Sequence, residues 1–252
     1  MVHFVGAGPG APDLITLRGA ALLQQADVVI YAGSLVNPAL LQQCKDTCEI
    51  HNSAHMTLQD ILSVIERAEA DRKTTVRLHT GDPSVYGAIR EQMDALKARG
   101  IAYDITPGVS SFCAAAAALD TEYTVPEISQ SVILTRMAGR TPTPPAESVA
   151  SLAAHGASMA VFLSAGMLDA LSAKLIQGAY TADTPAALVF KASWPEEKVV
   201  RCTVGTLAEA GRQNGIHQTA LVLVGDFLCE RPAPYSRLYD PSFSTGFREA
   251  RQ

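Results

Sequence analysis

Residues 2–11 join an apolar strand to a glycine-rich turn, and this feature constrains the fold more than any other part of the chain. Residues 2–5 read Val-His-Phe-Val, and residues 6–11 read Gly-Ala-Gly-Pro-Gly-Ala. Glycines in such a turn let backbone N–H groups approach a nucleotide-like ligand with no side chain in the way. Two interpretations are open: a ligand-binding loop, or a tight strand-to-helix turn without a ligand.

The same turn matches the G-x-G-x-x-A spacing of dinucleotide-binding folds. Two features disfavour a nicotinamide cofactor. Pro9 has no backbone N–H that could donate a hydrogen bond to a pyrophosphate. The next expected strand, residues 28–31, is followed by Ala32 and Gly33, where an acidic ribose-binding residue should stand. An NAD(P)-dependent oxidoreductase is therefore the alternative from a different enzyme class.

Composition narrows the class of protein further. The 252 residues are 48% hydrophobic and 18% charged, which is ample for buried parallel strands and far from disorder. A net charge of −5 without a long Lys/Arg run disfavours a nucleic-acid partner. The longest apolar run, residues 112–119, is too short to span a bilayer. Five cysteines outside any disulfide framework, with no visible export signal, predict a cytoplasmic protein.

Apolar runs alternate with helical patterns, which predicts an α/β fold with a mostly parallel first sheet. Its expected strands are residues 2–5, 28–31, 49–51, 75–79 and 102–106. The expected helices span residues 16–25, 38–45, about 58–65, 83 to about 99, and the Ala-rich stretch after 111, with Thr16 capping the first.

The second half of the chain predicts a mixed sheet. Its expected strands are residues 131–135, 159–163, 187–191, 198–203 and 220–225, and the run 198–203 after Trp194-Pro195 could pair antiparallel. A Thr/Pro-rich loop at residues 139–145 is long enough to be a functional flap. We expect domains at 1–120 and 131–230, a crossing segment at 121–130 and an irregular tail at 231–252.

Three glycine-containing turns should share one edge of the first sheet. Residues 6–10, 81–87 and 107–111 each follow an expected strand. In an open α/β sheet the carboxyl ends of the strands line one crevice. The sequence therefore predicts a ligand site at this edge.

Within these turns, individual polar residues have two interpretations. Asp82 before Pro83 could cap a helix, or its carboxylate could accept hydrogen bonds from an amino group or a ribose. Ser110 and Ser111 could likewise be helix caps or ligand donors.

One cluster resembles a zinc motif only superficially. Cys44, Cys48, His51 and His55 are spaced C-x3-C-x2-H-x3-H. A ββα zinc finger needs about twelve residues between its Cys and His pairs so that the chain can fold back around the ion. We therefore expect no metal, and buried or surface thiols instead.

Four motifs, in order along the chain, resemble the tetrapyrrole methylase family. They are Val-Gly-Ala-Gly-Pro-Gly at 5–10, Ala-Asp-Val-Val-Ile-Tyr at 26–31, Thr-Gly-Asp-Pro-Ser-Val-Tyr-Gly at 80–87 and Pro-Gly-Val-Ser-Ser at 107–111. The resemblance runs from residue 2 to about residue 225. It implies a two-domain α/β methyltransferase, usually a homodimer, that binds S-adenosylmethionine in the cleft between its domains.

Further motifs resemble the corrin branch of that family, which methylates precorrin-4 at carbon 11. They are Tyr-Ala-Gly-Ser-Leu-Val at 31–36, Ser-Ala-His-Met-Thr at 53–57, Glu-Ile-Ser-Gln at 127–130, Arg-Met-Ala-Gly-Arg-Thr-Pro at 136–142 and Ala-Ser-Trp-Pro at 192–195. Uroporphyrinogen-methylating relatives carry an aspartate in the first of these, where this chain has Ala32 and Gly33. These motifs disfavour a uroporphyrinogen-type or diphthamide-type methylase, and the catalytic residue stays unknown.

Carried over position by position, the resemblance implies residues that contact the cofactor. They are Pro9, Thr80, Gly81, Asp82, Val85, Ser110, Ser111, Leu163, Ala192, Thr219 and Ala220. Most would contribute backbone groups or apolar walls. A reduced tetrapyrrole bears many carboxylates, so its side of the site should offer cations and hydroxyls, and the candidates are Ser34, His55, Arg136, Arg140 and Lys191.

The expected chemistry needs few ionisable groups. Methyl transfer from a sulfonium is an in-line displacement, so the protein mainly aligns the reactants and excludes water. We therefore expect no obligatory general base. A non-enzymatic nucleotide-sensing module is the remaining alternative, since a sequence alone does not prove turnover.

Overall fold

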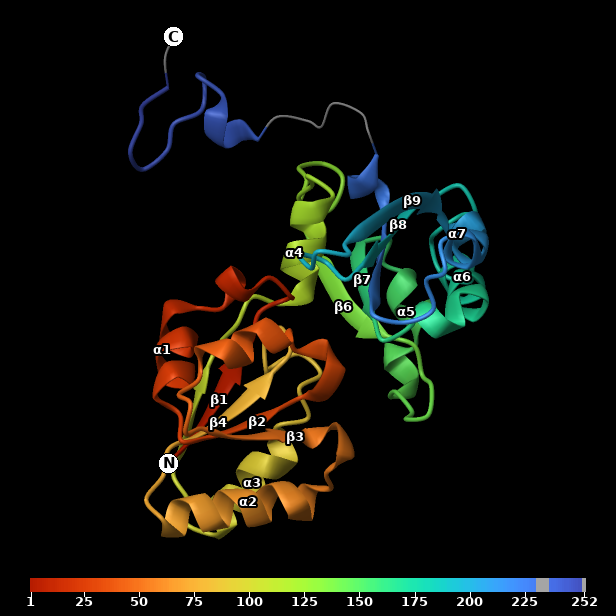
Figure 1. Cartoon of the computed structure of the whole chain (residues 1–252). Coiled ribbons are helices and arrows are strands. Elements are labelled where there is room, and N and C mark those ends of the chain that lie inside the picture. The colour runs from red at the N-terminus through yellow and green to blue at the C-terminus, as the bar shows by residue number, and fades with distance from the viewer. Residues whose placement is uncertain (230–235, 251–252) are drawn as a thin grey trace. The chain divides into compact units, whose positions relative to one another are not determined.

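The structure is a computed structural model that describes residues 1–229 and 236–250 of the chain (Figure 1). The chain divides into two compact units. Unit 1 holds Met1–Ala115 and Lys191–Glu197, and unit 2 holds Ala116–Phe190 and Lys198–Gln252. The division therefore falls inside helix α4 (Ser111–Ala118), whereas the sequence places a domain boundary after Asp120. Part of the expected tail, residues 230–235 and 251–252, lies outside the described residues.

Unit 1 is built on a five-stranded sheet of order β3-β2-β4-β1-β5. Its strands are β1 (Val2–Gly6), β2 (Val28–Tyr31), β3 (Glu49–Asn52), β4 (Thr75–His79) and β5 (Tyr103–Thr106). Every pair of neighbouring strands is parallel, which confirms the expected parallel sheet. Because β1 lies between β4 and β5, the turns that follow these three strands leave the same edge.

Helices cover both faces of this sheet. Helices α2 (Leu58–Ala70) and α3 (Arg90–Ala98) lie on one face (Figure 1). Their buried side chains share an apolar cluster with Val2 and Phe4 of β1. On the other face, α1 (Leu17–Gln25) packs through Leu23 on Val5. Thr16 caps α1, because its hydroxyl accepts a hydrogen bond from the N–H of Gly19 at 3.1 Å, as the sequence predicts.

One expected helix begins later than the sequence indicates. The prediction of a helix starting at Pro83 is wrong, because α3 begins only at Arg90. The Asp82 side chain accepts a hydrogen bond from the Ser84 N–H at 2.8 Å and closes a turn. Tyr86 and Ala88 then have φ values of +55° and +48°, which an α-helix does not permit.

Unit 2 is built on a mixed five-stranded sheet of order β6-β7-β10-β8-β9. Its strands are β6 (Val132–Arg136), β7 (Ser158–Phe162), β8 (Pro185–Phe190), β9 (Lys198–Thr203) and β10 (Ala220–Val224). The β6–β7 pair is parallel and the other pairs are antiparallel, which confirms the expected mixed sheet and the antiparallel β9. Helices α5 (Val149–Ala153), α6 (Leu168–Ile176) and α7 (Leu207–Gln213) share one apolar core with this sheet.

Short 3-10 helices connect the main elements. They are η1 (Pro12–Leu14), η2 (Gly33–Leu35), η3 (Pro38–Gln43), η4 (Ser53–His55), η5 (Pro145–Glu147), η6 (Ala165–Met167), η7 (Val204–Thr206), η8 (Asp226–Leu228) and η9 (Arg237–Tyr239). The helix expected over residues 38–45 is thus the 3-10 helix η3. Within residues 1–229 and 236–250, no helix combines the length and apolar character needed to cross a membrane.

Candidate functional site

The turns after β1 and β4 are joined backbone to backbone. The N–H of Gly81 donates to the carbonyl of Gly8 at 2.8 Å, and the N–H of Gly8 donates to the carbonyl of Gly81 at 3.3 Å. Both glycines have positive φ, +78° at Gly8 and +60° at Gly81, which favours glycine at both positions. The structure thus brings together two of the three turns that the sequence singles out.

The turn after β5 packs against the same two turns. A Cβ added to Gly108 would lie 2.2 Å from the carbonyl oxygen of Gly81 and 2.7 Å from Cα of Gly6. Only glycine permits this approach of one backbone to another. Gly81 differs, because the nearest atom to an added Cβ there would be 3.5 Å away, on Ser110.

Asp82 connects the second turn to the third. One carboxylate oxygen accepts hydrogen bonds from the N–H and the hydroxyl of Ser84, and the other accepts from the N–H of Gly108 at 2.8 Å. Burial alone would raise the pKa of Asp82, but these hydrogen bonds outweigh it and hold that pKa below its ordinary value. Asp82 is therefore a negative charge that fixes the turns, and of its two interpretations the helix cap is wrong, because α3 begins only at Arg90.

Two polar atoms beside these turns are buried without a partner among the described residues. They are the Thr80 hydroxyl and Nε2 of His79. His79 ends β4, and its ring lies 5.9 Å from that of Phe4. Burial, together with the charge of Arg77, lowers the pKa of His79 to about 3, so the imidazole is neutral. Thr80 is a sequence-predicted site residue; His79 is not, since a strand-end histidine carries no distinguishing sequence signal.

The segment Lys191–Glu197 lies against the first turn of unit 1, although it connects β8 to β9. The hydroxyl of Ser193 accepts a hydrogen bond from the N–H of Ala11 at 3.0 Å, and Nε1–H of Trp194 donates to the carbonyl of Pro9 at 3.0 Å. The sequence assigned Ala192 to the second domain, but the structure groups it with unit 1.

Lys191, a candidate for the substrate side, begins this segment. Its ammonium nitrogen lies 5.1 Å from the centroid of the Trp194 ring and 3.6 Å from the carboxylate of Glu196. The cation therefore already has two neighbours within its own loop.

The candidates in unit 2 gather at one edge of its sheet. The strand register pairs Arg136 with Phe162, Val222 with Val161 and Ala220 with Phe190. Leu163 follows β7 and Thr219 precedes β10, so both lie at the edge where β6 ends.

Two of these edge residues have strained backbones. Leu163 and Thr219 have φ values of +52° and +54°, a backbone conformation that residues other than glycine rarely adopt. Leu163 is also 64% exposed, which is unusual for a large apolar side chain at the end of a buried strand. Backbone strain of this kind concentrates at ligand sites, so both observations favour a site here.

Arg136 is largely engaged by its own loop. Its guanidinium donates to the carbonyls of Met137 at 3.1 Å and Thr141 at 3.2 Å, and to that of Pro142 at 2.9 Å. These bonds hold the loop expected as a flap in one conformation. Arg140, within that loop, is exposed.

For the remaining candidates, His55, Ser34 and Ser110, the structure gives position and exposure but few contacts. His55 is exposed at the end of η4. Ser34 lies in η2, but its side chain is not among those that the structure describes. Ser110 is buried at the start of α4, where its carbonyl accepts from the N–H of Cys113 at 3.0 Å.

The cysteine and histidine cluster offers no metal geometry. Burial raises the pKa of the Cys44 thiol and raises that of Cys48 to about 11. His51 instead contacts the carboxylate of Glu49 at 2.8 Å. Across the described ranges, no group of three or more His, Cys, Asp or Glu side chains could hold a metal ion.

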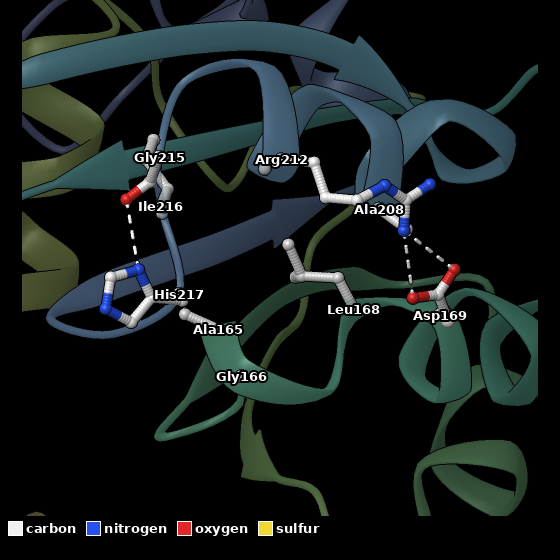
Figure 2. Close-up of a pocket in the computed structure, with 10 residues that line it drawn as sticks. Ala165, Gly166, Leu168, Asp169, Ala208, Arg212, Gly215, Ile216 and His217 are labelled. Atoms are coloured by element: carbon white, nitrogen blue, oxygen red, sulfur yellow. Dashed lines mark hydrogen bonds and ion pairs between the residues drawn. The ribbon is translucent and has the colours of Figure 1, made fainter.

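Unit 2 also carries an open hollow of about 330 Å³ beside α6 and α7 (Figure 2). Figure 2 shows the ion pair of Arg212 and Asp169 at one end and His217 at the other. Its lining residues are Ala165, Gly166, Leu168, Asp169, Ala208, Gly211, Arg212, Gly215, Ile216 and His217. None of them is a sequence-predicted site residue, and its charged groups are exposed and paired with each other.

This chain is similar to known methyltransferases that act on tetrapyrroles. A family model described as "Tetrapyrrole (Corrin/Porphyrin) Methylases" matches residues 1–208. A cobalt-precorrin-4 C(11)-methyltransferase from Methanocaldococcus jannaschii is 50% identical over 249 residues, which cover 99% of this chain and 96% of that protein.

Two solved structures resemble the fold over most of its length. The X-ray structure of a cobalamin biosynthetic enzyme, cobalt precorrin-4 methyltransferase, matches with a TM-score of 0.89 and 46% identity, covering 90% of this chain and 95% of that one. A uroporphyrin-III C-methyltransferase from Thermus thermophilus, solved with S-adenosyl homocysteine, matches with a TM-score of 0.76 and 25% identity, covering 94% and 98%.

Proposed function

Because the chain belongs to the tetrapyrrole methylase family, we propose that it transfers a methyl group from S-adenosylmethionine to carbon 11 of precorrin-4 or of its cobalt form. The observation that carries this proposal is the half-identical, nearly full-length match to a relative named for that reaction. The structural neighbour named as a cobalt precorrin-4 methyltransferase supports the same activity.

The residues of unit 1 fit the methyl donor. The Thr80 hydroxyl is buried without a partner, and a buried hydroxyl gains stability when a ligand supplies the missing hydrogen bond. Gly81 has a φ of +60°, which favours glycine, so the turn that follows Thr80 keeps its backbone conformation only without a side chain. Asp82 places a negative charge at the same turns, which suits a donor with a positive sulfur.

The chain's contribution to the reaction is alignment. When bound, S-adenosylmethionine supplies the methyl group and, as the sulfur becomes a neutral thioether, the leaving group. The turns of unit 1 would hold the donor by backbone groups and fix its direction toward the acceptor carbon. The Asp82 carboxylate is occupied by Ser84 and Gly108, and His79 is buried and neutral. Neither group is arranged to remove a proton, which supports a reaction without an obligatory general base.

The carboxylates of the acceptor need cations to bind them. We propose Arg140, His55 and Lys191 as direct contacts and Arg136 as the residue that orders the loop carrying Arg140. The three carbonyl acceptors of Arg136 are the reason for this assignment. We also propose that Leu163, Thr219 and Ala220 contact the methyl donor, as the family resemblance implies.

A uroporphyrinogen-type methylase is the second candidate, favoured by the fold that this chain shares with the Thermus thermophilus enzyme. Both candidates would use the same methyl donor, so donor binding does not distinguish them. The position of the new methyl group does.

We also propose that the protein is a cytoplasmic homodimer, as the family resemblance implies. Size-exclusion chromatography with light scattering would give the mass in solution. A mass equal to one 26.7 kDa chain at micromolar concentration would contradict the dimer.

The activity is tested by incubating the protein with ¹³C-methyl-labelled S-adenosylmethionine and either precorrin-4 or cobalt-precorrin-4. NMR of the product should locate the label at carbon 11. A label at another ring carbon, or transfer to uroporphyrinogen III in preference to both substrates, would overturn the assignment.

A further inference from the structure

Side chains from two distant segments hold the backbone of residues 9–11. Trp194 donates through Nε1–H to the carbonyl of Pro9, and Ser193 accepts from the N–H of Ala11, each at 3.0 Å. The amide of Asn37 donates to the carbonyl of Gly10 at 2.9 Å. Three consecutive residues of the glycine turn are therefore fixed from outside the turn itself.

Trp194 also fills the space that a side chain at residue 10 would need. A Cβ added to Gly10 would lie 2.0 Å from Cδ1 and 2.2 Å from Nε1 of Trp194, and its three nearest atoms all belong to that indole. Gly10 has no positive φ, so its backbone would accept alanine. The indole therefore occupies the space that a side chain at this position would need.

The loop that carries Trp194 is held in one conformation by hydrogen bonds within the loop. Lys191 and Ser193 have φ values of +47° and +66°, an unfavourable backbone for either residue. The N–H of Ser193 donates to the carboxylate of Glu197 at 2.6 Å, and the N–H of Trp194 donates to the carbonyl of Lys191 at 2.9 Å. Internal hydrogen bonds thus maintain a strained loop whose ends continue into β8 and β9.

We propose that Trp194 is a positioning residue for the methyl donor, acting through the Pro9 carbonyl and the packing on Gly10. This inference rests on the proposed function, in which the donor binds at the turns of unit 1. A ligand that requires the fixed turn binds more tightly when the loop is docked. By linkage, the same ligand favours the docked loop.

Calorimetry with S-adenosylhomocysteine, run beside thermal unfolding, tests the proposal. Trp194→Phe keeps a ring but removes the donor to Pro9, and loss of one hydrogen bond should weaken binding about fivefold. Trp194→Ala should weaken it further. Glu196→Gln, an exposed position in the same loop, is the matched control and should bind as the wild type does. A merely structural role would lower the melting temperature and leave the affinity unchanged.

A double-mutant cycle makes the test independent of any single variant. Gly10→Ala should weaken binding about tenfold in the wild type, because the methyl group displaces the indole. In a Trp194→Ala background the space is empty, so adding Gly10→Ala should change affinity by less than about twofold. An equal loss in both backgrounds would overturn the inference.

Trp194 is the only tryptophan in the chain, so its fluorescence reports directly on the docked loop. Adding S-adenosylhomocysteine to the wild type should reduce acrylamide quenching, and Gly10→Ala should increase it. If the wild type binds S-adenosylhomocysteine but Trp194→Phe and Trp194→Ala bind it equally well, the positioning role is wrong. If the wild type does not bind it at all, the proposed function fails instead.

Discussion

The carboxylate of Asp82 accepts a hydrogen bond from the backbone N–H of Gly108 at 2.8 Å, although the two residues lie on turns that follow different strands. Asp82 also accepts hydrogen bonds from the N–H and the hydroxyl of Ser84. Its carboxylate therefore joins two turns of the candidate donor site. The same bonds hold its pKa below the ordinary value of 3.8, so its negative charge is present throughout the neutral range.

Asp82→Asn should therefore weaken S-adenosylhomocysteine binding, because an amide nitrogen would face one of the N–H donors. We expect a loss of about 1–3 kcal/mol in binding free energy, measured by calorimetry. The carboxylate's contribution to stability is present above pH 3.8 and is lost as the pH falls toward its lower folded pKa. Unchanged binding by a folded Asp82→Asn variant would contradict a role at the donor site.

Buried His79 should make the free energy of unfolding depend on pH, in a higher pH range than Asp82 does. Its folded pKa is about 3, whereas an unfolded histidine has a pKa of 6.5. The free energy of unfolding is therefore not lowered by His79 above pH 6.5, where the unfolded histidine is also neutral. Below pH 6.5 it falls with decreasing pH, by at most about 1.4 kcal/mol per pH unit. Urea unfolding between pH 4.5 and 7.5 should show this slope, and His79→Leu should flatten it. The same slope in the variant would mean that another group is responsible.

Local patterns in the sequence predicted most of the strands, because several buried strands, such as β2, β7 and β10, are short and mainly apolar. The late start of α3 escaped prediction, because Asp82 before Pro83 has the sequence of a capped helix start. The turn that Asp82 forms with Ser84, and the positive φ values after it, are not visible in the sequence. The docking of Trp194 on Pro9 joins residues 185 positions apart, and no local pattern encodes such a pair. The sequence predicts that Arg136 binds substrate carboxylates. In the structure its guanidinium donates to backbone carbonyls of its own loop, and no local sequence pattern indicates these contacts.

Arg136 and Arg140 should therefore respond differently to substitution. Arg136→Ala frees the loop from three carbonyl contacts, so it should raise the KM for the tetrapyrrole and also increase proteolysis within residues 137–142. Arg140→Ala should raise KM by about fivefold or less, as expected for an exposed ion pair, and leave the loop ordered. Steady-state kinetics and limited proteolysis of both variants provide the measurement. Equal proteolysis of both would remove the distinction.

Methyl transfer itself should require no obligatory general base. Two titratable groups at the donor turns are the Asp82 carboxylate, held by Ser84 and Gly108, and His79, whose pKa is about 3, and neither is placed to act as a base near neutrality. Well-oriented reactants can gain roughly 7–11 kcal/mol from proximity alone, so alignment can account for much of the rate. Single-turnover methylation should vary little between about pH 6.5 and 8.5, outside the range in which His79 titrates in the folded protein.

The exposed His55 offers the sharpest check of that expectation, because it is a titratable candidate on the substrate side whose imidazole is open to solvent. His55→Ala should lose much less than the roughly 10²–10⁴-fold expected of an acid–base residue, and the loss should appear in KM rather than in the single-turnover rate. Rapid-quench methylation with labelled donor, repeated across the pH range for wild type and variant, separates the two effects. A steep limb in the wild-type pH–rate profile that disappears in His55→Ala would identify His55 as the base and overturn the alignment mechanism.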